Sequence, residues 1–236
     1  MTTESVGSPF VAVGTDRHVR GIARVGPMSG VLAVALWIAA AVLLDHNEAS
    51  ALGDSDKASA AQIAAYLHDE AATIYLGTIL FGIGSVAFLW FLATLRERLA
   101  PAPGGLPTWA FASGAVAIAT TSGFFAMRLG ATMALDARPD GISDQAVEAL
   151  YVGMDGFFVM TWFALGGFYL ATGVASLRIG ALPTWLSWTT VALGVIALVV
   201  WIAWIAEFLL PLWVAMVTAS LVRHNARQVV SSQVGA

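Results

Sequence analysis

The chain contains no cysteine among its 236 residues. Disulfide bonds, thiolate metal sites, iron–sulfur clusters and cysteine nucleophiles are therefore all excluded. The sequence also lacks a Walker loop, an HExxH motif, a GxSxG motif and a dinucleotide-binding fingerprint. We therefore expect neither enzyme activity nor a bound cofactor.

Charged residues are scarce, at 11% of the chain, whereas hydrophobic residues make up 58%. A soluble domain carries about 25% charged residues, so this chain has too few to cover a surface in water. Several apolar runs reach the ~18 residues that indicate a membrane-spanning helix. The composition predicts an all-α polytopic membrane bundle whose partner is the lipid bilayer. Nucleic-acid binding is not expected, because the basic residues form no extended patch.

Six apolar segments are expected to cross the membrane, at residues 28–44, 71–95, 108–135, 149–177, 184–204 and 208–222. A single helix over 184–222 would be about 58 Å long, against a hydrocarbon core of about 30 Å. We therefore place a reversal at Trp204–Phe208. Residues 27–224 form the transmembrane domain, between a flexible tail at 1–26 and a second tail at 225–236.

Several residues predict where helices begin or end. Ser59 and Gln62 have the spacing of a capping box, and Ser143 is a suitable N-cap. Pro27 occupies a position that tolerates proline at the start of a helix. Gly180 is expected to close the fourth segment.

The arginines predict the orientation. With six spans, eight of them fall on one side: Arg17, Arg20, Arg24, Arg96, Arg98, Arg178, Arg223 and Arg227. Lys57 and Arg138 fall on the other side. An excess of positive charge marks the cytoplasmic side, so both termini are expected inside, in the cytoplasmic membrane.

The first apolar segment has a second interpretation. Ala49–Ala51 resembles the cleavage site of a secretory signal. The 17-residue run is longer than the usual signal core of about 7–15 residues, and this favours a retained span.

A four-residue motif occurs twice in the chain. Leu106–Trp109 and Leu182–Trp185 are both Leu-Pro-Thr-Trp. The repeat is consistent with three related helical hairpins, as in parallel-repeat transporters. The alternative is a general preference for proline at helix starts and tryptophan at the interface.

Three stretches carry a family resemblance: 61–99, 149–158 (ALYVGMDGFF) and 176–188 (SLRIGALPTWLSW). They resemble a family of uncharacterised bacterial six-span membrane proteins with no established activity. The resemblance implies a topology and no function.

Three charged residues stand out in or beside the apolar segments. Arg128 and Asp155 are expected at matching depth near the outer surface, and Glu207 at the outer turn of the last two segments. Ionisable residues inside spans are functional candidates, so the three predict an outward-facing binding or proton-coupling site. The alternative is an ion pair that fastens two helices, or an arginine that reaches the headgroups.

Other candidates have weaker signals. His46 and His68 lie among carboxylates in an acidic loop, but their spacing matches no known metal-site signature, so no metal site is predicted. Small residues recur at four-residue spacing in two segments, which favours close helix packing. They are Ala115, Ala119, Gly123, Gly167, Ala171 and Ala175.

Two functional hypotheses follow. The scarcity of polar groups favours a non-enzymatic accessory or assembly subunit that binds a membrane-protein partner or a second copy of itself. The alternative is a small-solute or proton-coupled transporter or channel that uses Arg128, Asp155 and Glu207.

Overall fold

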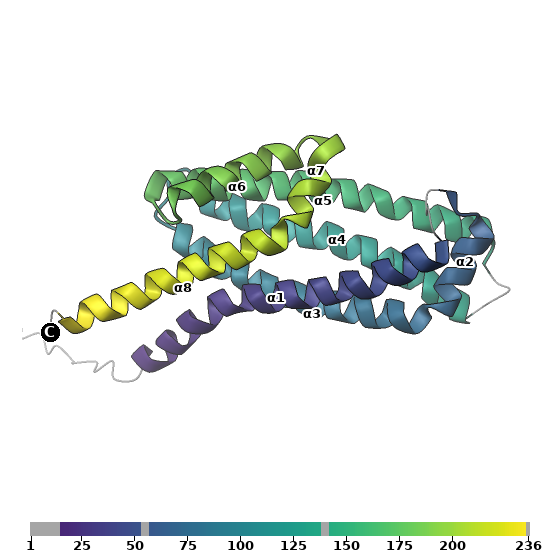
Figure 1. Ribbon diagram of the computed structural model, residues 1–236, viewed down its shortest axis with the longest axis horizontal. Helices are drawn as coiled ribbons and strands as arrows, with labels where there is room; N and C mark the ends of the chain where they lie inside the picture. Colours follow the sequence, from purple (N-terminus) through teal and green to yellow (C-terminus); the bar gives the residue numbers. More distant parts are fainter. Residues whose placement is uncertain (1–14, 53–56, 138–141, 235–236) are drawn as a thin grey trace, which may run out of the picture.

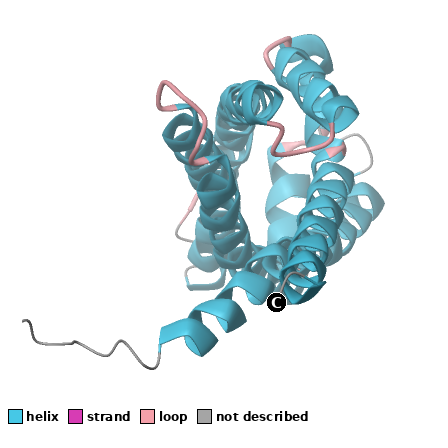
Figure 2. Cartoon of the chain, turned by 90° about the vertical axis from the view of Figure 1, so that its left-hand side faces the viewer, coloured by secondary structure: helices cyan, strands magenta, loops and turns pink. Residues whose placement is uncertain are grey.

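The computed structural model describes the backbone of residues 15–52, 57–137 and 142–234, and the side chains of 26–52, 57–137 and 142–223. Most of the expected tail at 1–26 and the loop residue Arg138 lie outside this part. The described elements are all helical (Figure 2). They are α1 (Thr15–Leu52), α2 (Ala60–Asp69), α3 (Ala71–Leu99), α4 (Leu106–Ala137), α5 (Asp144–Ile179), α6 (Thr184–Ala197), η2 (Val200–Ile202), α7 (Ala203–Phe208) and α8 (Leu210–Val234).

Four described helices are long and apolar enough to cross a membrane: α1 from Gly26, α3, α4 and α5. They run lengthwise beside one another, with α2 across one end (Figure 1). A fifth span is reached only if α6 and the segment Val200–Phe208 count as one, although the chain bends by 114° between them. The helices therefore support a membrane protein with four or five spans, and the expected six are not confirmed.

Three predicted helix boundaries are confirmed. Ser59 Oγ accepts a hydrogen bond from the Gln62 backbone N–H at 3.3 Å, and Gln62 Oε1 accepts one from the Ser59 N–H at 2.9 Å. Ser143 caps α5 through the Ala146 N–H at 3.3 Å. Gly180 ends α5 with a φ of 64°, a left-handed conformation that glycine adopts without a steric cost.

The first helix differs from its prediction. α1 begins at Thr15 and continues through Pro27, so the expected start at this proline is wrong. Proline has no backbone N–H, so α1 lacks one of its backbone hydrogen bonds at this position. Here Ser29 Oγ donates to the Gly26 carbonyl at 2.6 Å, and Thr218 of α8 donates to the Pro27 carbonyl at 3.2 Å. α1 also contains the signal-like stretch 49–51.

The last apolar region turns back halfway along the bundle. α6 has 14 residues and is about 21 Å long. At its end Leu198 packs over Gly166, near the middle of α5, and the Tyr169 hydroxyl of α5 donates to the Ala206 carbonyl at 3.1 Å. The helix therefore breaks at Leu198, before the reversal expected at Trp204–Phe208. No polar residue or glycine marks this break in the sequence.

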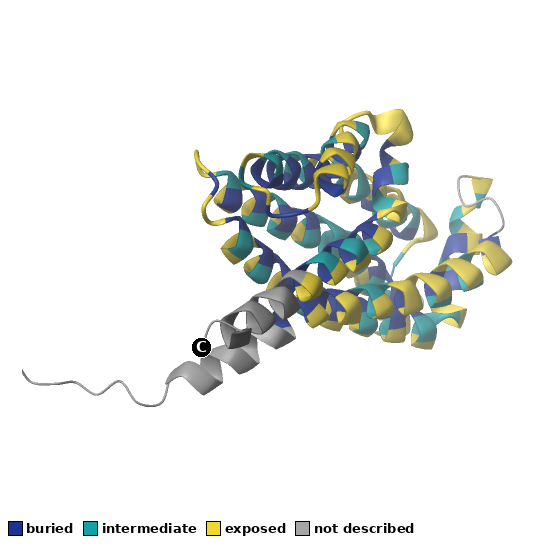
Figure 3. Ribbon diagram, turned by 60° about the vertical axis from the view of Figure 1, so that its left-hand side comes forward, coloured by how far each residue is buried: buried dark blue, intermediate teal, exposed yellow. Residues whose placement is uncertain are grey.

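Aromatic side chains hold α8 in place. The Trp213 ring is fully buried, and its centroid lies 5.3 Å from the rings of Phe168 and Tyr169 and 6.4 Å from the ring of Phe91. Its indole N–H donates to Thr190 Oγ1 of α6 at 2.7 Å. Buried residues gather on the inward faces of the helices, and the outward faces are exposed (Figure 3).

We predict that Gly173→Ala destabilises the protein. A Cβ at this position would lie 2.9 Å from the Val191 backbone nitrogen and 3.0 Å from the Ser187 carbonyl oxygen, so α5 and α6 would have to separate. Overpacking of this kind costs about 1–3 kcal/mol. Gly82→Ala is the matched control, because nothing lies within 4 Å of its Cβ position. Thermal unfolding in detergent measures both, and equal melting temperatures would contradict the close α5–α6 contact.

Candidate functional site

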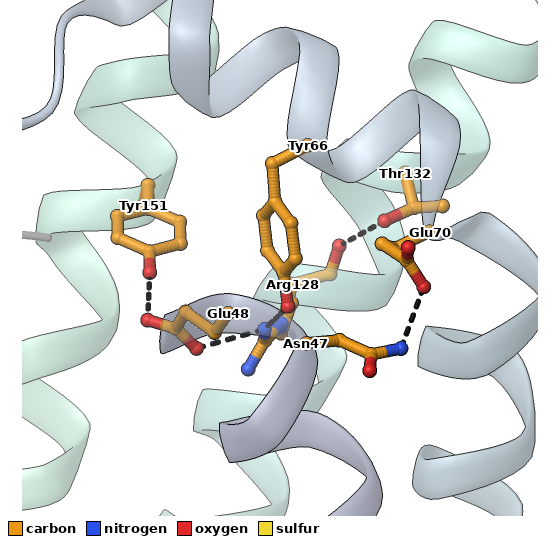
Figure 4. A network of polar contacts seen from close by, with 7 residues as sticks. All are labelled: Asn47, Glu48, Tyr66, Glu70, Arg128, Thr132 and Tyr151. Carbon is orange, nitrogen blue, oxygen red and sulfur yellow. Dashed lines mark hydrogen bonds and ion pairs between the residues drawn. The ribbon is translucent and has the colours of Figure 1, made fainter. Parts of the chain in front are cut away.

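A group of polar side chains joins four helices at the end of the bundle covered by α2 (Figure 4). We call it the Arg128 cluster: Arg128 of α4, Glu48 of α1, Tyr66 of α2 and Tyr151 of α5. Arg128 is 2% exposed, so its charge is almost entirely removed from solvent. A buried charge is costly unless it is paired and hydrogen-bonded, and the cluster supplies both.

Glu48 is the counter-ion of Arg128. Its Oε2 lies 2.8 Å from Arg128 Nη2, and its Oε1 accepts a hydrogen bond from the Tyr151 hydroxyl. The Glu48 side chain is 22% exposed, so the pair lies at the edge of the buried region. One carboxylate therefore connects α1 to both α4 and α5.

Tyr66 connects the short helix α2 to the same arginine. Arg128 Nη2 donates to the Tyr66 hydroxyl, and the guanidinium carbon lies 5.3 Å from the ring centroid, a cation–π distance. Ile63, Tyr66 and Leu67 are buried at i, i+3, i+4 spacing, so α2 packs its apolar face on the bundle. Burial raises the pKa of Tyr66 to about 12, against the smaller opposing effect of the Arg128 charge. The hydroxyl is therefore neutral at physiological pH.

A second polar contact ties α1 to the α2–α3 junction. Asn47 Nδ2 donates to Glu70 Oε2 at 2.7 Å, and Thr73 Oγ1 donates to the same oxygen at 3.1 Å. Glu70 is the single residue between α2 and α3. This contact fixes the angle at which α2 leaves α3, and with it the position of Tyr66 over Arg128.

The cluster has the chemistry to bind a carboxylate or phosphate. Arg128 Nη2 is already bonded to Glu48 and Tyr66, whereas the buried Arg128 Nε has no hydrogen-bond partner within the described residues. A partly open depression of about 240 Å³ lies beside it, lined by Ala51, Gln62, Ala65, Tyr66, Asp69 and Glu70. Arg128 is not among the lining residues, and the two charged ones are acidic. The arrangement therefore fastens helices and does not present a cation to an external anion.

The structure places the three predicted charges in different surroundings. Arg128 forms an ion pair with Glu48 and a hydrogen bond with Tyr66. Asp155 is exposed on α5, and its pairing with Arg128 stays a prediction. Glu207 of α7 accepts a hydrogen bond from the Trp162 indole N–H at 2.8 Å, near the middle of α5. It therefore lies close to the helix break, at the level of the middle of α5, and its place at an outer turn stays a prediction.

The weaker candidates also have defined positions. His68 Nδ1 lies 3.7 Å from Asp136 Oδ1, and both side chains are largely exposed, as is His46. In the described part of the chain, no group of three or more His, Asp or Glu residues is placed to hold a metal ion.

The predicted small-residue stripes lie only partly between α4 and α5. Gly123 faces the ring of Phe157, and Gly167 faces Ser113, whereas Ala119 is exposed. Ala171 and Ala175 are buried and Ala115 is half-buried. Among the described glycines, Gly173 and Gly194 lie closest to the backbone of another helix and bring α5 and α6 together, and we had not singled them out.

Sequence reasoning missed Glu48, Tyr66 and Tyr151 as site residues. The first span was expected at 28–44, which places Glu48 beyond its end, whereas α1 continues to Leu52. The sequence did contain one indication of Glu48 as a site residue. Asn47 and Glu48 are one helical turn beyond the apolar run, so they face the bundle if the helix continues.

We predict that Glu48→Gln strongly destabilises the protein, because it leaves Arg128 buried without a counter-ion. Breaking a buried pair in this way costs about 3–5 kcal/mol. Adding Arg128→Gln to Glu48→Gln should recover at least half of the loss. The measurement is thermal unfolding of the purified variants, and Glu97→Gln, which changes an exposed carboxylate of α3, is the matched control. If Glu48→Gln is as stable as Glu97→Gln, Glu48 is not the effective counter-ion of Arg128.

We predict that Tyr66 makes the stability of the protein fall at alkaline pH. The pKa of Tyr66 is raised in the folded protein, so its stabilising effect is complete below pH 10 and is lost as pH rises toward about 12. The wild-type melting temperature should therefore fall more steeply between pH 10 and pH 12 than that of Tyr66→Phe. Parallel curves for the two proteins would show that Tyr66 ionises as freely in the folded state as in the unfolded state.

Comparisons with known proteins yield no match: no family model, no curated protein and no solved structure is similar to this chain. The family resemblance noted in the sequence therefore stays an expectation.

Proposed function

We propose that the protein is a non-enzymatic subunit of the cytoplasmic membrane that binds and stabilises other membrane proteins, with both termini in the cytoplasm. The start of α1 and the ends of α3, α5 and α8 lie at one end of the bundle (Figure 1). The last turn of α3 contains Arg96 and Arg98, and the last turn of α5 contains Arg178. The other five arginines noted above are in the first third of α1 or the second half of α8, which begin and end, respectively, at the same end of the bundle. The positive-inside rule supports a cytoplasmic position for this end.

The observation that carries the proposal is the use of ionisable side chains within the helices. Arg128 is paired with Glu48 and covered by Tyr66, and Glu207 is hydrogen-bonded to Trp162. A solute pathway needs polar groups that a solute can reach, whereas these groups hold α1, α2, α4, α5 and α7 together. Polar groups that fasten helices, with apolar outer faces, support an assembly role.

A small-solute or proton-coupled transporter is the second candidate, and one observation favours it. The helix break at Leu198 lies near the middle of α5, with the Glu207 carboxyl close to it. Broken helices with an ionisable group near mid-membrane are typical of transporters. In that case Glu207, with Arg128 and Asp155, would form an outward-facing site.

Purification of the tagged full chain from its native membrane in mild detergent tests the first proposal. We expect a second membrane protein to co-purify in a fixed ratio that survives a salt wash, because contacts between apolar faces are not screened by salt. A tagged multi-pass protein of similar size, purified from the same membrane, is the control for non-specific recovery.

Reconstitution into vesicles with a trapped pH-sensitive dye tests the second candidate. Under the subunit proposal, proton flux down an imposed gradient equals that of protein-free vesicles. The subunit proposal would be overturned in favour of transport if the flux exceeds this level, if Glu207→Gln removes the excess, and if the matched variant Glu97→Gln on α3 keeps it.

A further inference from the structure

Two hydroxyl groups of α5 differ from all other buried hydroxyls of serine and threonine in the described residues. Thr172 and Ser176 are each 0% exposed, and neither Thr172 Oγ1 nor Ser176 Oγ has a hydrogen-bond partner there. The other buried serines and threonines each donate to a backbone carbonyl, in most cases the one four residues earlier in the same helix. A buried polar group without a partner is rare, so these two require an explanation.

The two hydroxyls lie on one face of α5 that points into the bundle. They are four residues apart, so their Cβ atoms are about 5–6 Å from each other. Tyr169 precedes Thr172 by three residues on the same face, and its ring centroid lies 5.3 Å from that of Trp213 of α8. α6 contacts the neighbouring face through Gly173. The hydroxyls are therefore enclosed by protein and do not face lipid.

This pair of hydroxyls is close to one end of the bundle. α5 ends at Ile179, so Ser176 lies about 5 Å and Thr172 about 10 Å from the end of the helix. The ends of α3 and α8 lie at the same end of the bundle (Figure 1), and Arg178 and Gly180 are exposed there. A small molecule from the water at this end has one to two helical turns to cross.

The chemistry of the pair favours a small neutral ligand. Residues 156–177 and 184–206 contain no charged side chain, so an ion at this site would have no counter-ion on the adjacent parts of α5 and α6. Each hydroxyl can donate one hydrogen bond and accept others, so one water molecule can bridge two hydroxyls at this spacing. Buried waters in proteins have such polar partners. A larger solute is not expected, because both side chains are fully enclosed.

We propose that Thr172 and Ser176 bind a water molecule inside the bundle, one to two helical turns from the end of α5. The water satisfies both hydroxyls in place of the helix backbone. The same face of α5 continues to Tyr169, whose hydroxyl donates to the Ala206 carbonyl, and to Trp162, whose indole N–H donates to Glu207. Hydrogen-bonding groups then follow this face from the end of the helix to the Glu207 carboxyl near the helix break.

Pulsed X-ray radiolysis in ¹⁸O-labelled water tests the site directly. The pulse converts water to hydroxyl radicals, which label the side chains beside that water. Tyr169 is 0% exposed, so its label would come from bound water. We expect Tyr169 to be labelled in the wild type, with a yield at least fivefold lower in the double variant Thr172→Val, Ser176→Ala. Phe81, which packs between the rings of Trp37 and Phe125, is the internal control and should keep its yield.

Two results of this experiment would overturn the proposal. They are an unlabelled Tyr169 in the wild type, and an equal yield at Tyr169 in the wild type and the double variant. Thr172→Ser keeps a hydroxyl at this position and should keep the label. A loss of label in Thr172→Ser as large as in the double variant would also contradict a site made by the hydroxyls.

Thermal unfolding in detergent gives an independent result. Ser176→Ala removes one partner of the water, so we expect its melting temperature to be about 2–4 °C below that of the matched variant Ser85→Ala. Ser85 is also buried, but its hydroxyl donates to the Phe81 carbonyl of its own helix at 2.9 Å. Equal melting temperatures would mean that Ser176 bonds to its own helix, and a more stable Ser176→Ala would mean that its hydroxyl has no partner at all. Either result contradicts the water site.

Discussion

A backbone in hydrocarbon has no water to bond with, so each N–H and C=O group must find a partner within the protein. Most of the described chain meets this requirement with long continuous helices, of which α1, α3, α4 and α5 are long enough to span. At the break after α6, the Tyr169 hydroxyl of α5 helps to meet this requirement by donating to the Ala206 carbonyl.

The Arg128 cluster shows a second use of polar groups in this protein. A charge at the centre of a bilayer costs about 2.5–3.5 kcal/mol on insertion scales, and less toward the interface. Arg128 offsets that cost through Glu48 and two tyrosines, which come from three other helices. Because α2 is amphipathic and short, its position depends on Tyr66 and on the contacts of Glu70 with Asn47 and Thr73. The contacts of one buried charge thereby hold four helices in position at this end of the bundle.

The sequence predicted the helical membrane class and several boundaries well, because these depend on local signals. Ser59, Ser143 and Gly180 act on backbone groups within a few residues of themselves, so their roles are visible without the fold. The site was harder, because Glu48 and Arg128 are 80 residues apart and meet only if α1 extends beyond its apolar run. The break at Leu198 was also hidden. Its residues are as apolar as those of a span, and the cause of the turn is packing against α5 and α8.

The contact between Thr218 and Pro27 joins residues 191 positions apart in the sequence. Ribosomes add about 5–20 residues per second, so α1 leaves the ribosome about 10 to 40 s before its partner on α8 exists. During that interval the face of α1 around Gly30 can pack against Phe91 of α3, but its contacts with Val214 and Thr218 of α8 cannot yet form. The first helix of the chain thus completes its contacts only when α8 has been made, and a chain shortened before α8 would leave this part of α1 open to other membrane helices.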